Sequence, residues 1–275
     1  MTSVLRSALA LTLTLLSACA HRGQTTPSSE NTRVVAASPP SSCFLLFEIG
    51  VGEVRRLPSE SCSTRITPAS TFKIPHALAA LDSGVLSGAA VTFTYDGATD
   101  VPETWKRDHT LATAMRYSVV WYFQRVAKML GPDHERKYLV KLDYGNQDSS
   151  SSLTTFWLDE SLKISPDEQE RFLVRLYTDA LPVSKEAMRT VREILVQPPG
   201  VVVNAWDEHP FDAPWPEGTV VSAKTGSGDN VRWLVGHVER GHRAWVFVSC
   251  IVGAGLDRLG AIDLAAKSLR AEHVL

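Results

Sequence analysis

The sequence predicts a mixed α+β fold, with strands at the two ends of the chain and helices in its middle. Two patterns predict it. Three strand-like runs at hairpin spacing occupy 219–252, and another hairpin pattern covers 43–57. Between these ends, apolar residues recur at helical spacing, most clearly over 110–130. The chain has 275 residues, enough for one large domain or two small ones with an ample hydrophobic core.

Composition narrows the classes of function. Charged residues make up 21% of the chain and hydrophobic residues 44%, and the formal net charge is −2. These values are typical of a globular protein and lack the basic excess of a nucleic-acid-binding protein or a polybasic membrane patch. The eight histidines form no His-Glu-x-x-His spacing and the four cysteines no Cys-x-x-Cys spacing, so we predict no metal site.

Residues 1–19 have the pattern of an export signal: a positive charge, an apolar run too short to span a bilayer, and small residues after it. The letters LSAC at 16–19 resemble a bacterial lipobox, in which Cys19 is lipidated and becomes the mature N-terminus. Ordinary cleavage near Ala18 or Ala20 is the alternative. Either route predicts a periplasmic protein, and the first predicts a lipoprotein anchored to the bacterial membrane.

Residues 20–42 are rich in Ser, Thr and Pro without apolar periodicity, which predicts a flexible tether. A single domain is expected over 43–275. It begins with an apolar run at 43–49, predicted as a strand buried on both faces, and its hairpin partner at 53–57.

Export permits disulfide bonds, and the cysteines can be sorted on that basis. Cys43 and Cys62 are close enough in sequence to close a short loop, so they are a candidate pair. Cys250 lies inside an apolar run and is predicted to be a buried free thiol.

Ser70 and Lys73 are three residues apart, so in a helix they project from one face within hydrogen-bonding reach. Lysine can act as the base for a serine nucleophile only when neutral, which requires an apolar setting such as Phe72 and Ile74 provide. Pro75 places the pair at a helix start. Taken alone, the Ser-x-x-Lys spacing also occurs by chance in surface helices.

Ser118 and Val120 lie within the helix expected over 110–130. They fit a helix face in a core. The functional interpretation is that Ser118 reaches the Ser70 site as a proton relay while the valines keep the lysine pocket dry. The letters YGN at 144–146 predict a turn.

Trp157 fits a core position, where its indole N–H would need an acceptor. Two helices with N-cap signals follow, beginning after Ser165 and at Ser184, and neither is assigned any chemistry. A last amphipathic helix is expected over 257–270.

The strand expected over 219–225 ends in the letters KTG at 224–226. A lysine at a strand end is normally solvated. Beside a serine nucleophile, Lys224 would attract a carboxylate-bearing ligand, and Gly226 would let that ligand approach the backbone.

These motifs occur in one order, and together they resemble the class D serine β-lactamases, the oxacillinases. The set is Ser70-x-x-Lys73, Ser118-x-Val120, Tyr144-Gly145-Asn146, Trp157, Lys224-Thr225-Gly226 and Trp233-Leu234-Val235-Gly236. The resemblance covers nearly everything from residue 43 onward. Other penicillin-recognising proteins carry asparagine where this chain has Val120, which argues against class A enzymes and most peptidoglycan transpeptidases.

The resemblance implies a three-layer fold like that of serine β-lactamases and penicillin-binding proteins. Its antiparallel sheet would combine the N-terminal hairpin with the three C-terminal strands. The first and last helices would cover the sheet, a mostly helical insertion would lie between, and Ser70 would sit at the junction.

The resemblance also implies that Ser70 attacks the lactam carbonyl of β-lactam antibiotics and forms an acyl-enzyme. Lys73 would be carbamylated by carbon dioxide to N6-carboxylysine and act as general base, with no other cofactor. Val120 would keep that pocket dry, and Trp157 would donate its indole N–H to the carbamate.

The leaving nitrogen would receive a proton through Ser118, with Lys224 supplying positive charge. The backbone N–H groups of Ser70 and Ser227 would form the oxyanion hole. Ser227 stands where many relatives carry an aromatic residue. The implied substrate contacts are Tyr144, Thr225, Gly226, Ser227 and Arg258, with Thr225 and Arg258 on the substrate carboxylate.

Three alternatives share these motifs. A β-lactam sensor would stay acylated and normally follows several membrane helices. A penicillin-binding transpeptidase or carboxypeptidase is disfavoured by Val120, and a catalytically silent lipoprotein by the complete set of polar groups. The preferred antibiotic and the oligomeric state are not predicted.

Overall fold

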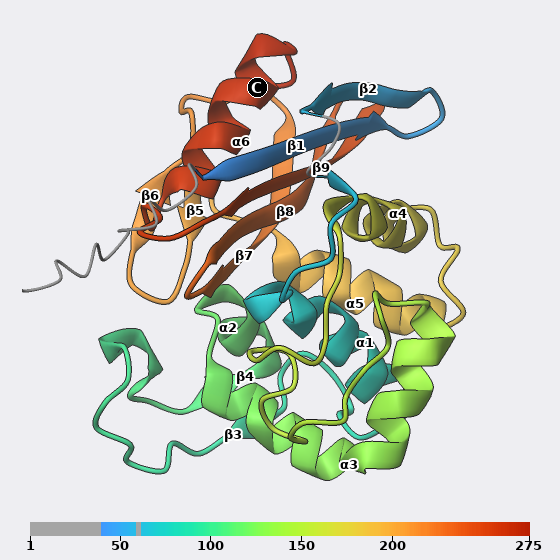
Figure 1. Ribbon diagram of the computed structural model, residues 1–275, viewed down its shortest axis with the longest axis vertical. Coiled ribbons are helices and arrows are strands. Elements are labelled where there is room, and N and C mark those ends of the chain that lie inside the picture. Colours follow the sequence, from blue (N-terminus) through green and yellow to red (C-terminus); the bar gives the residue numbers. More distant parts are fainter. Residues whose placement is uncertain (1–39, 59–61) are drawn as a thin grey trace, which may run out of the picture. The chain divides into compact units, whose positions relative to one another are not determined.

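A five-stranded antiparallel sheet forms the upper part of the structure, a computed structural model that describes residues 40–58 and 62–275. The expected export signal, Cys19 and nearly all of the tether lie outside these residues. The strand order is β2-β1-β9-β8-β7 (Figure 1). The strands are β1 (Ser41–Glu48), β2 (Gly52–Leu57), β7 (Thr219–Gly228), β8 (Val231–Arg240) and β9 (Arg243–Val252).

The sheet joins the two ends of the chain as predicted, because β1 pairs along its whole length with β9. Successive residues of β1 enter two different cores: Cys43 and Leu45 face one, Phe44 and Leu46 the other. A strand covered on both faces reads as a continuous apolar run. The strand begins at Ser41, so the tether was predicted two residues too long.

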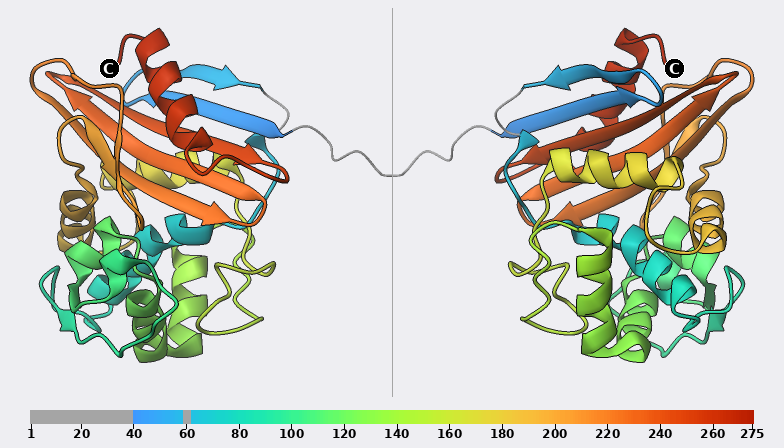
Figure 2. Two further views of the ribbon diagram at one scale, coloured as in Figure 1. Left: turned by 90° about the vertical axis from the view of Figure 1, so that its left-hand side faces the viewer. Right: turned by 90° about the vertical axis from the view of Figure 1, so that its right-hand side faces the viewer.

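Helices cover both faces of this sheet (Figure 2). On one face lies α6 (Gly260–Ala271), packed on β8 and β9. On the other face lie α4 (Pro166–Tyr177) and η2 (Ala69–Phe72), a 3₁₀ turn that contacts β7. The last helix therefore covers the sheet as expected. The first, α1, packs instead against other helices, because the turn before it already occupies the space next to β7.

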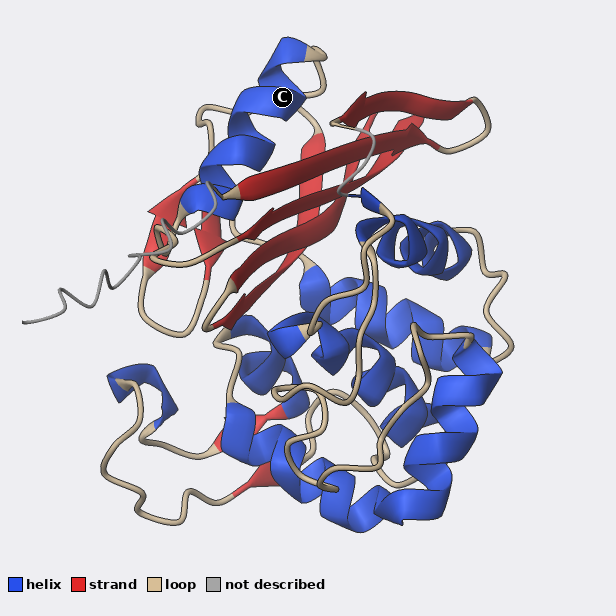
Figure 3. Cartoon of the chain, in the orientation of Figure 1, coloured by secondary structure: helices blue, strands red, loops and turns tan. Residues whose placement is uncertain are grey.

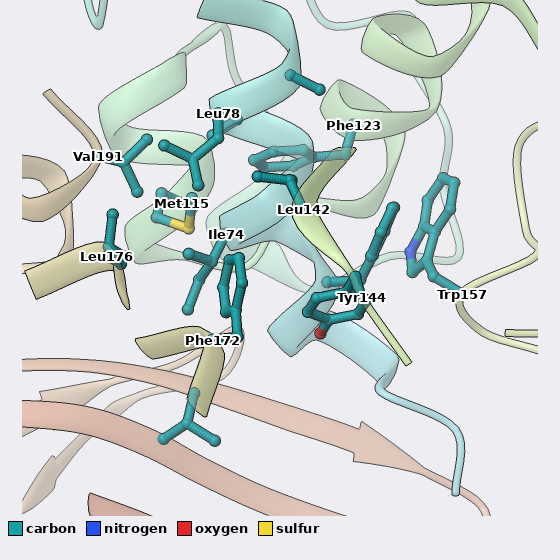
Figure 4. Packing of buried hydrophobic residues seen from close by; sticks show 14 of the residues in the cluster. Ile74, Leu78, Met115, Phe123, Leu142, Tyr144, Trp157, Phe172, Leu176 and Val191 are labelled. Atoms are coloured by element: carbon teal, nitrogen blue, oxygen red, sulfur yellow. The ribbon is translucent and has the colours of Figure 1, made fainter. Parts of the chain in front are cut away.

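The remaining helices form a second part of the molecule (Figure 3). Ile74 and Leu78 of α1 pack there against Phe123 and Met115 (Figure 4). Its elements are α1 (Lys73–Asp82), α2 (Leu111–Arg116), α3 (Val120–Leu142), α5 (Lys185–Leu195), the short pair β3 (Thr92–Phe93) with β4 (His109–Thr110), and η3 (Glu103–Trp105). A second short pair, β5 (Val201–Val203) with β6 (Glu208–Pro210), lies instead beside the sheet and α6 (Figure 1). Among the described residues, no helix is both long and apolar enough to cross a membrane.

The helix predicted over 110–130 is broken in the structure. It ends at Arg116 and restarts at Val120, and Ser118 between them has a φ of 57°. A second break follows at Gly131, with a φ of 74°, before Pro132. Apolar spacing could not show the first break, since both segments bury the same face. The capped start of α4 is confirmed, with Ser165 and Glu168 forming a capping box.

Candidate active site

Ser70 lies in η2 and faces the lysine that opens α1. Lys73 Nζ donates a hydrogen bond to Ser70 Oγ at 2.6 Å. The turn starts at Ala69, whose φ of 48° lies in the left-handed region that costs a non-glycine residue about 1–2 kcal/mol. Pro75 lies in the first turn of α1, as predicted. The local backbone therefore presents the hydroxyl outward and keeps the amine behind it.

The Lys73 amine is fully buried. Burial lowers the pKa of Lys73 well below its usual value of 10.5, and the nearby charge of Lys224 lowers this pKa further. The Phe123 ring centroid lies 5.6 Å from Lys73 Nζ, and Phe72 and Ile74 are buried beside it. A neutral amine can act as a base or add to an electrophile, and an ammonium group cannot.

Ser118 and Lys224 form a second hydrogen-bonded pair at the same site. Lys224 Nζ donates to Ser118 Oγ and to the carbonyl of Thr225, both at 2.9 Å. Burial lowers the pKa of Lys224 to about 7. Because Ser118 lies in the left-handed turn between α2 and α3, its side chain reaches across to β7. The break that sequence patterning missed is thus what brings Ser118 to the site.

Trp157 is fully buried behind the serine, stacked on Phe72 at a centroid distance of 5.7 Å. Its indole nitrogen has no hydrogen-bond acceptor among the described residues. A buried indole N–H normally finds one. A neutral lysine and an orphaned donor in one dry pocket fit a carboxylate carried on Lys73.

A cavity of about 160 Å³ opens in front of Ser70. At Gly226 a Cβ atom would lie 3.0 Å from Thr71 Cγ2 and 3.1 Å from the carbonyl of Pro68, so glycine lets β7 approach η2 closely without crowding. Residues that line the cavity include Ser70, Ser118, Val120, Thr225, Gly226, Ser227, Arg258, Trp105, Trp206, Leu158 and Arg232.

Two loops meet over this cavity. Thr104 Oγ1 in η3 donates to the carbonyl of Ala205, in the turn between β5 and β6, at 2.5 Å. The adjacent tryptophans, Trp105 and Trp206, both line the cavity. No local pattern in the sequence indicates that these loops touch, because 101 positions separate the two residues in contact.

Arg258 also lines the cavity, and its guanidinium group is already bound to Asp207. Arg258 Nη2 donates to Asp207 Oδ2 at 2.8 Å, and the two side chains are 46% and 41% exposed. A guanidinium group at this place suits a substrate carboxylate. Asp207 was not among the predicted site residues, since a partner 51 positions away leaves no local pattern.

The sequence and the fold match known proteins along most of the chain. The penicillin binding protein transpeptidase domain matches residues 24–271. β-Lactamase OXA-48 of Klebsiella pneumoniae is 37% identical over 213 residues, 76% of this chain and 74% of that protein. The probable β-lactamase YbxI of Bacillus subtilis is 32% identical over 215 residues, 77% of this chain and 74% of that protein.

Among solved structures, the class D β-lactamase BAT-2 delta mutant matches with a TM-score of 0.76 and 30% identity, over 86% of this chain and 93% of that chain. A class D β-lactamase from Bacillus subtilis matches with a TM-score of 0.75 and 29% identity over the same shares. The chain belongs to the class D serine β-lactamases. The family and fold predicted from the motifs are therefore confirmed.

Tyr144 lies outside the class D cavity, although we expected it among the substrate contacts. It is fully buried, with its ring against Phe72 and Phe172 at 5.7 and 5.1 Å. The next residue explains why the motif is a turn: a Cβ atom at Gly145 would lie 2.1 Å from the carbonyl of Lys163. The Tyr-Gly-Asn motif therefore supports the site by packing Tyr144 against Phe72.

Cys43 and Cys62 are joined by a disulfide, and Cys250 is a buried free thiol. These are the states that sequence spacing favoured. Across residues 40–58 and 62–275, no group of three or more His, Cys, Asp or Glu side chains could hold a metal ion.

Proposed function

We propose that this class D enzyme hydrolyses the amide bond of β-lactam antibiotics through an acyl-enzyme on Ser70, with carbamylated Lys73 as general base. The observation that carries the proposal is the 2.6 Å contact between Ser70 Oγ and the fully buried Lys73 Nζ. Opening the lactam ring before the antibiotic reaches its target gives antibiotic resistance.

Carbamylation of Lys73 would need a neutral amine, and burial supplies one by lowering its pKa. The amine adds to carbon dioxide and loses one proton, which leaves a carboxylate that can accept the proton of Ser70. Trp157 would donate its orphaned indole N–H to that carboxylate. Phe72, Phe123 and Val120 exclude the water that would favour an ammonium group.

In acylation, Ser70 Oγ attacks the lactam carbonyl carbon while its proton passes to the base. The backbone N–H groups of Ser70 and Ser227 would stabilise the oxyanion, each worth about 3 kcal/mol in other acyl-transfer enzymes. When the C–N bond breaks, Ser118 would give its proton to the nitrogen and recover one from Lys224, 2.9 Å away. The same base would then activate water to release the acyl group.

Thr225 and Arg258 would hold the substrate carboxylate. Both line the cavity. Arg258 would exchange its bond with Asp207 for a bond with the substrate.

The test is hydrolysis of a chromogenic cephalosporin by protein that lacks residues 1–19, with bicarbonate removed and then restored. Sustained turnover that rises with bicarbonate is expected, and Lys73→Ala should abolish it while leaving the fold intact. Turnover that does not depend on bicarbonate and is retained in Lys73→Ala would exclude the carbamate as general base. A single burst with a stable Ser70 adduct would instead identify a sensor or a penicillin-binding protein.

We also propose export to the periplasm with a lipid anchor on Cys19, supported by the lipobox-like letters at 16–19. Cys19→Ala should move the protein from the membrane fraction to the soluble periplasm. An unchanged distribution would exclude the anchor.

A further inference from the structure

A buried histidine and a buried glutamate lie behind the Lys73 pocket, and the mechanism above uses neither. His76 on α1 and Glu135 on α3 are each 1% exposed. His76 Nε2 lies 2.7 Å from Glu135 Oε1, an approach that lacks hydrogen-bond geometry, and neither of these atoms nor His76 Nδ1 has a hydrogen-bond partner among the described residues. Their surroundings belong to the larger hydrophobic core, so this polar contact is enclosed by apolar side chains.

The His76 ring touches three aromatic residues, and one of them, Phe123, has its ring centroid 5.6 Å from Lys73 Nζ. The centroid of the His76 ring lies 5.2 Å from that of Phe72, 5.7 Å from Phe123 and 5.3 Å from Trp157. His76 follows Lys73 by one helical turn, so the two side chains project from the same side of α1. His76 therefore packs against the side of these aromatic rings that faces away from the Lys73 amine.

Glu135 reaches His76 because α3 changes direction. The helix starts at Val120, on the cavity side, and is broken at Gly131, where φ is 74°. Glu135 lies one turn beyond that break. The contact thus fixes the distal half of α3 to α1, while the proximal half carries Val120 and Phe123 into the pocket.

Stability alone does not account for this contact. Removing a carboxylate and an imidazole from water is costly, and apolar replacement of a buried pair is often neutral or stabilising. The same two helices are already joined elsewhere: Asp82 accepts hydrogen bonds from Tyr138 and Lys141 at 2.8 and 2.7 Å. What distinguishes the His76–Glu135 contact is its place against Phe72, Phe123 and Trp157.

We propose that His76 and Glu135 are positioning residues that hold the aromatic wall of the Lys73 pocket and thereby set the affinity of Lys73 for carbon dioxide. This inference rests on the proposed carbamylation. With the contact intact, the Phe72, Phe123 and Trp157 rings stay packed on His76 and water stays out. Without it, the wall loosens, the amine gains water and a proton, and the carbamate is lost more readily.

The experiment compares wild type with Glu135→Gln, which is nearly isosteric, and His76→Asn. The bicarbonate concentration for half-maximal activity should rise roughly 10-fold or more in both, as when a ligand-orienting partner is removed from a metal site. Saturating bicarbonate should restore most of kcat, and ¹³C NMR with labelled bicarbonate should show the weaker carbamate. The double variant should resemble either single variant.

The matched control is Tyr138→Phe. It removes a partly buried hydrogen bond between the same two helices, at Asp82, about 13 Å along α1 from Lys73. It should lower Tm without changing the bicarbonate requirement. If Glu135→Gln and His76→Asn likewise lower only Tm, the contact is merely structural and the inference is wrong. If wild type itself shows no bicarbonate response and no carbamate signal, the general base proposed for this enzyme fails as well.

Discussion

Val120 gives the most direct residue-scale test of the lysine environment. It lines the cavity beside a lysine whose pKa burial holds well below 10.5. Val120→Asn would bring a polar amide and water to that amine, which stabilises the ammonium form. Each unit by which the pKa of Lys73 rises lowers the reactive amine fraction about tenfold. We therefore expect half-maximal activity to need roughly 10-fold more bicarbonate, measured by titration at constant pH.

Val120→Ile is the control for this change, because it alters shape without adding a polar group. It should keep the bicarbonate requirement close to that of wild type. An equal rise in both variants would mean that shape, and not dryness, governs the lysine.

At the residue scale, the sequence predicted the reacting groups better than the residues that position them. Ser70 with Lys73 lies in one helical turn, so spacing alone predicts that contact. Lys224 reaches Ser118 over 106 positions, and only the family resemblance placed that pair together. His76 with Glu135 had no such guide, because a histidine inside an apolar helix face has the pattern of any core position.

At the element scale, Glu170 makes the stability of α4 depend on pH. Burial raises the pKa of Glu170 to about 7, and the nearby Glu53 raises this pKa further. In the unfolded chain the group ionises near 4.5, so the folded state resists ionisation and stability falls as pH rises from about 4.5 to 7. Glu170→Gln should increase the free energy of unfolding at pH 8 by at most about 3 kcal/mol.

Urea unfolding of wild type and Glu170→Gln at pH 4 and pH 8 measures this difference. The two proteins should differ little at pH 4, where the carboxyl group is protonated in both states. Glu193→Gln, on the exposed side of α5, is the control. A gain that is equal at both pH values would show that the effect is packing, not ionisation.

The turn between β5 and β6 should influence substrate affinity through Asp207. Its bond to Arg258 is exposed, and such pairs contribute about 0–1 kcal/mol, so a substrate carboxylate can displace it. Asp207→Asn removes the competitor and should lower KM for carboxylate-bearing substrates by up to about 5-fold, with kcat little changed. Steady-state kinetics beside Glu208→Gln, an exposed neighbour in β6, would show whether the effect belongs to Asp207. A raised KM would mean that Asp207 orients Arg258 for the substrate.

Helices and strands were predictable where their local sequence pattern is strong. They were not predictable where the conformation of a loop sets the end of a helix. The capping box at Ser165 predicts the start of α4, and the C-terminal strands follow from alternation and turns. No glycine or proline marks the break at Ser118, where a serine adopts the positive φ. Its side chain finds Lys224 only in the folded protein, so the local sequence could not show it.

At the scale of the whole molecule, the site depends on contacts between segments that are remote in sequence. η2 sits against β7 because Gly226 permits the approach, and Trp233 Nε1 on β8 donates to the carbonyl of Thr67 at 3.0 Å, just before η2. Thr104 donates a hydrogen bond to the carbonyl of Ala205, 101 positions later, and this contact closes the rim of the cavity. Local patterns predicted strands at the ends of the chain and helices in its middle, the family resemblance predicted their layers, and closure of the cavity had to be read from the structure.

The Cys43–Cys62 disulfide fixes the start of the sheet to the segment that leads into η2, across a separation of 19 residues. Closing a loop of this length restricts the unfolded chain and stabilises a protein by about 3 kcal/mol. We expect Cys43→Ser with Cys62→Ser to lower the free energy of unfolding by about that amount in urea titrations, with kcat retained at 25 °C because Ser70 and Lys73 lie outside the loop. Cys250→Ala, which removes a thiol with no partner, is the control for loss of a buried cysteine, and reducing agent should destabilise it and wild type alike. If reduction leaves wild type as stable as before, the bond does not form in the mature protein, and the segment before η2 is held by its packing alone.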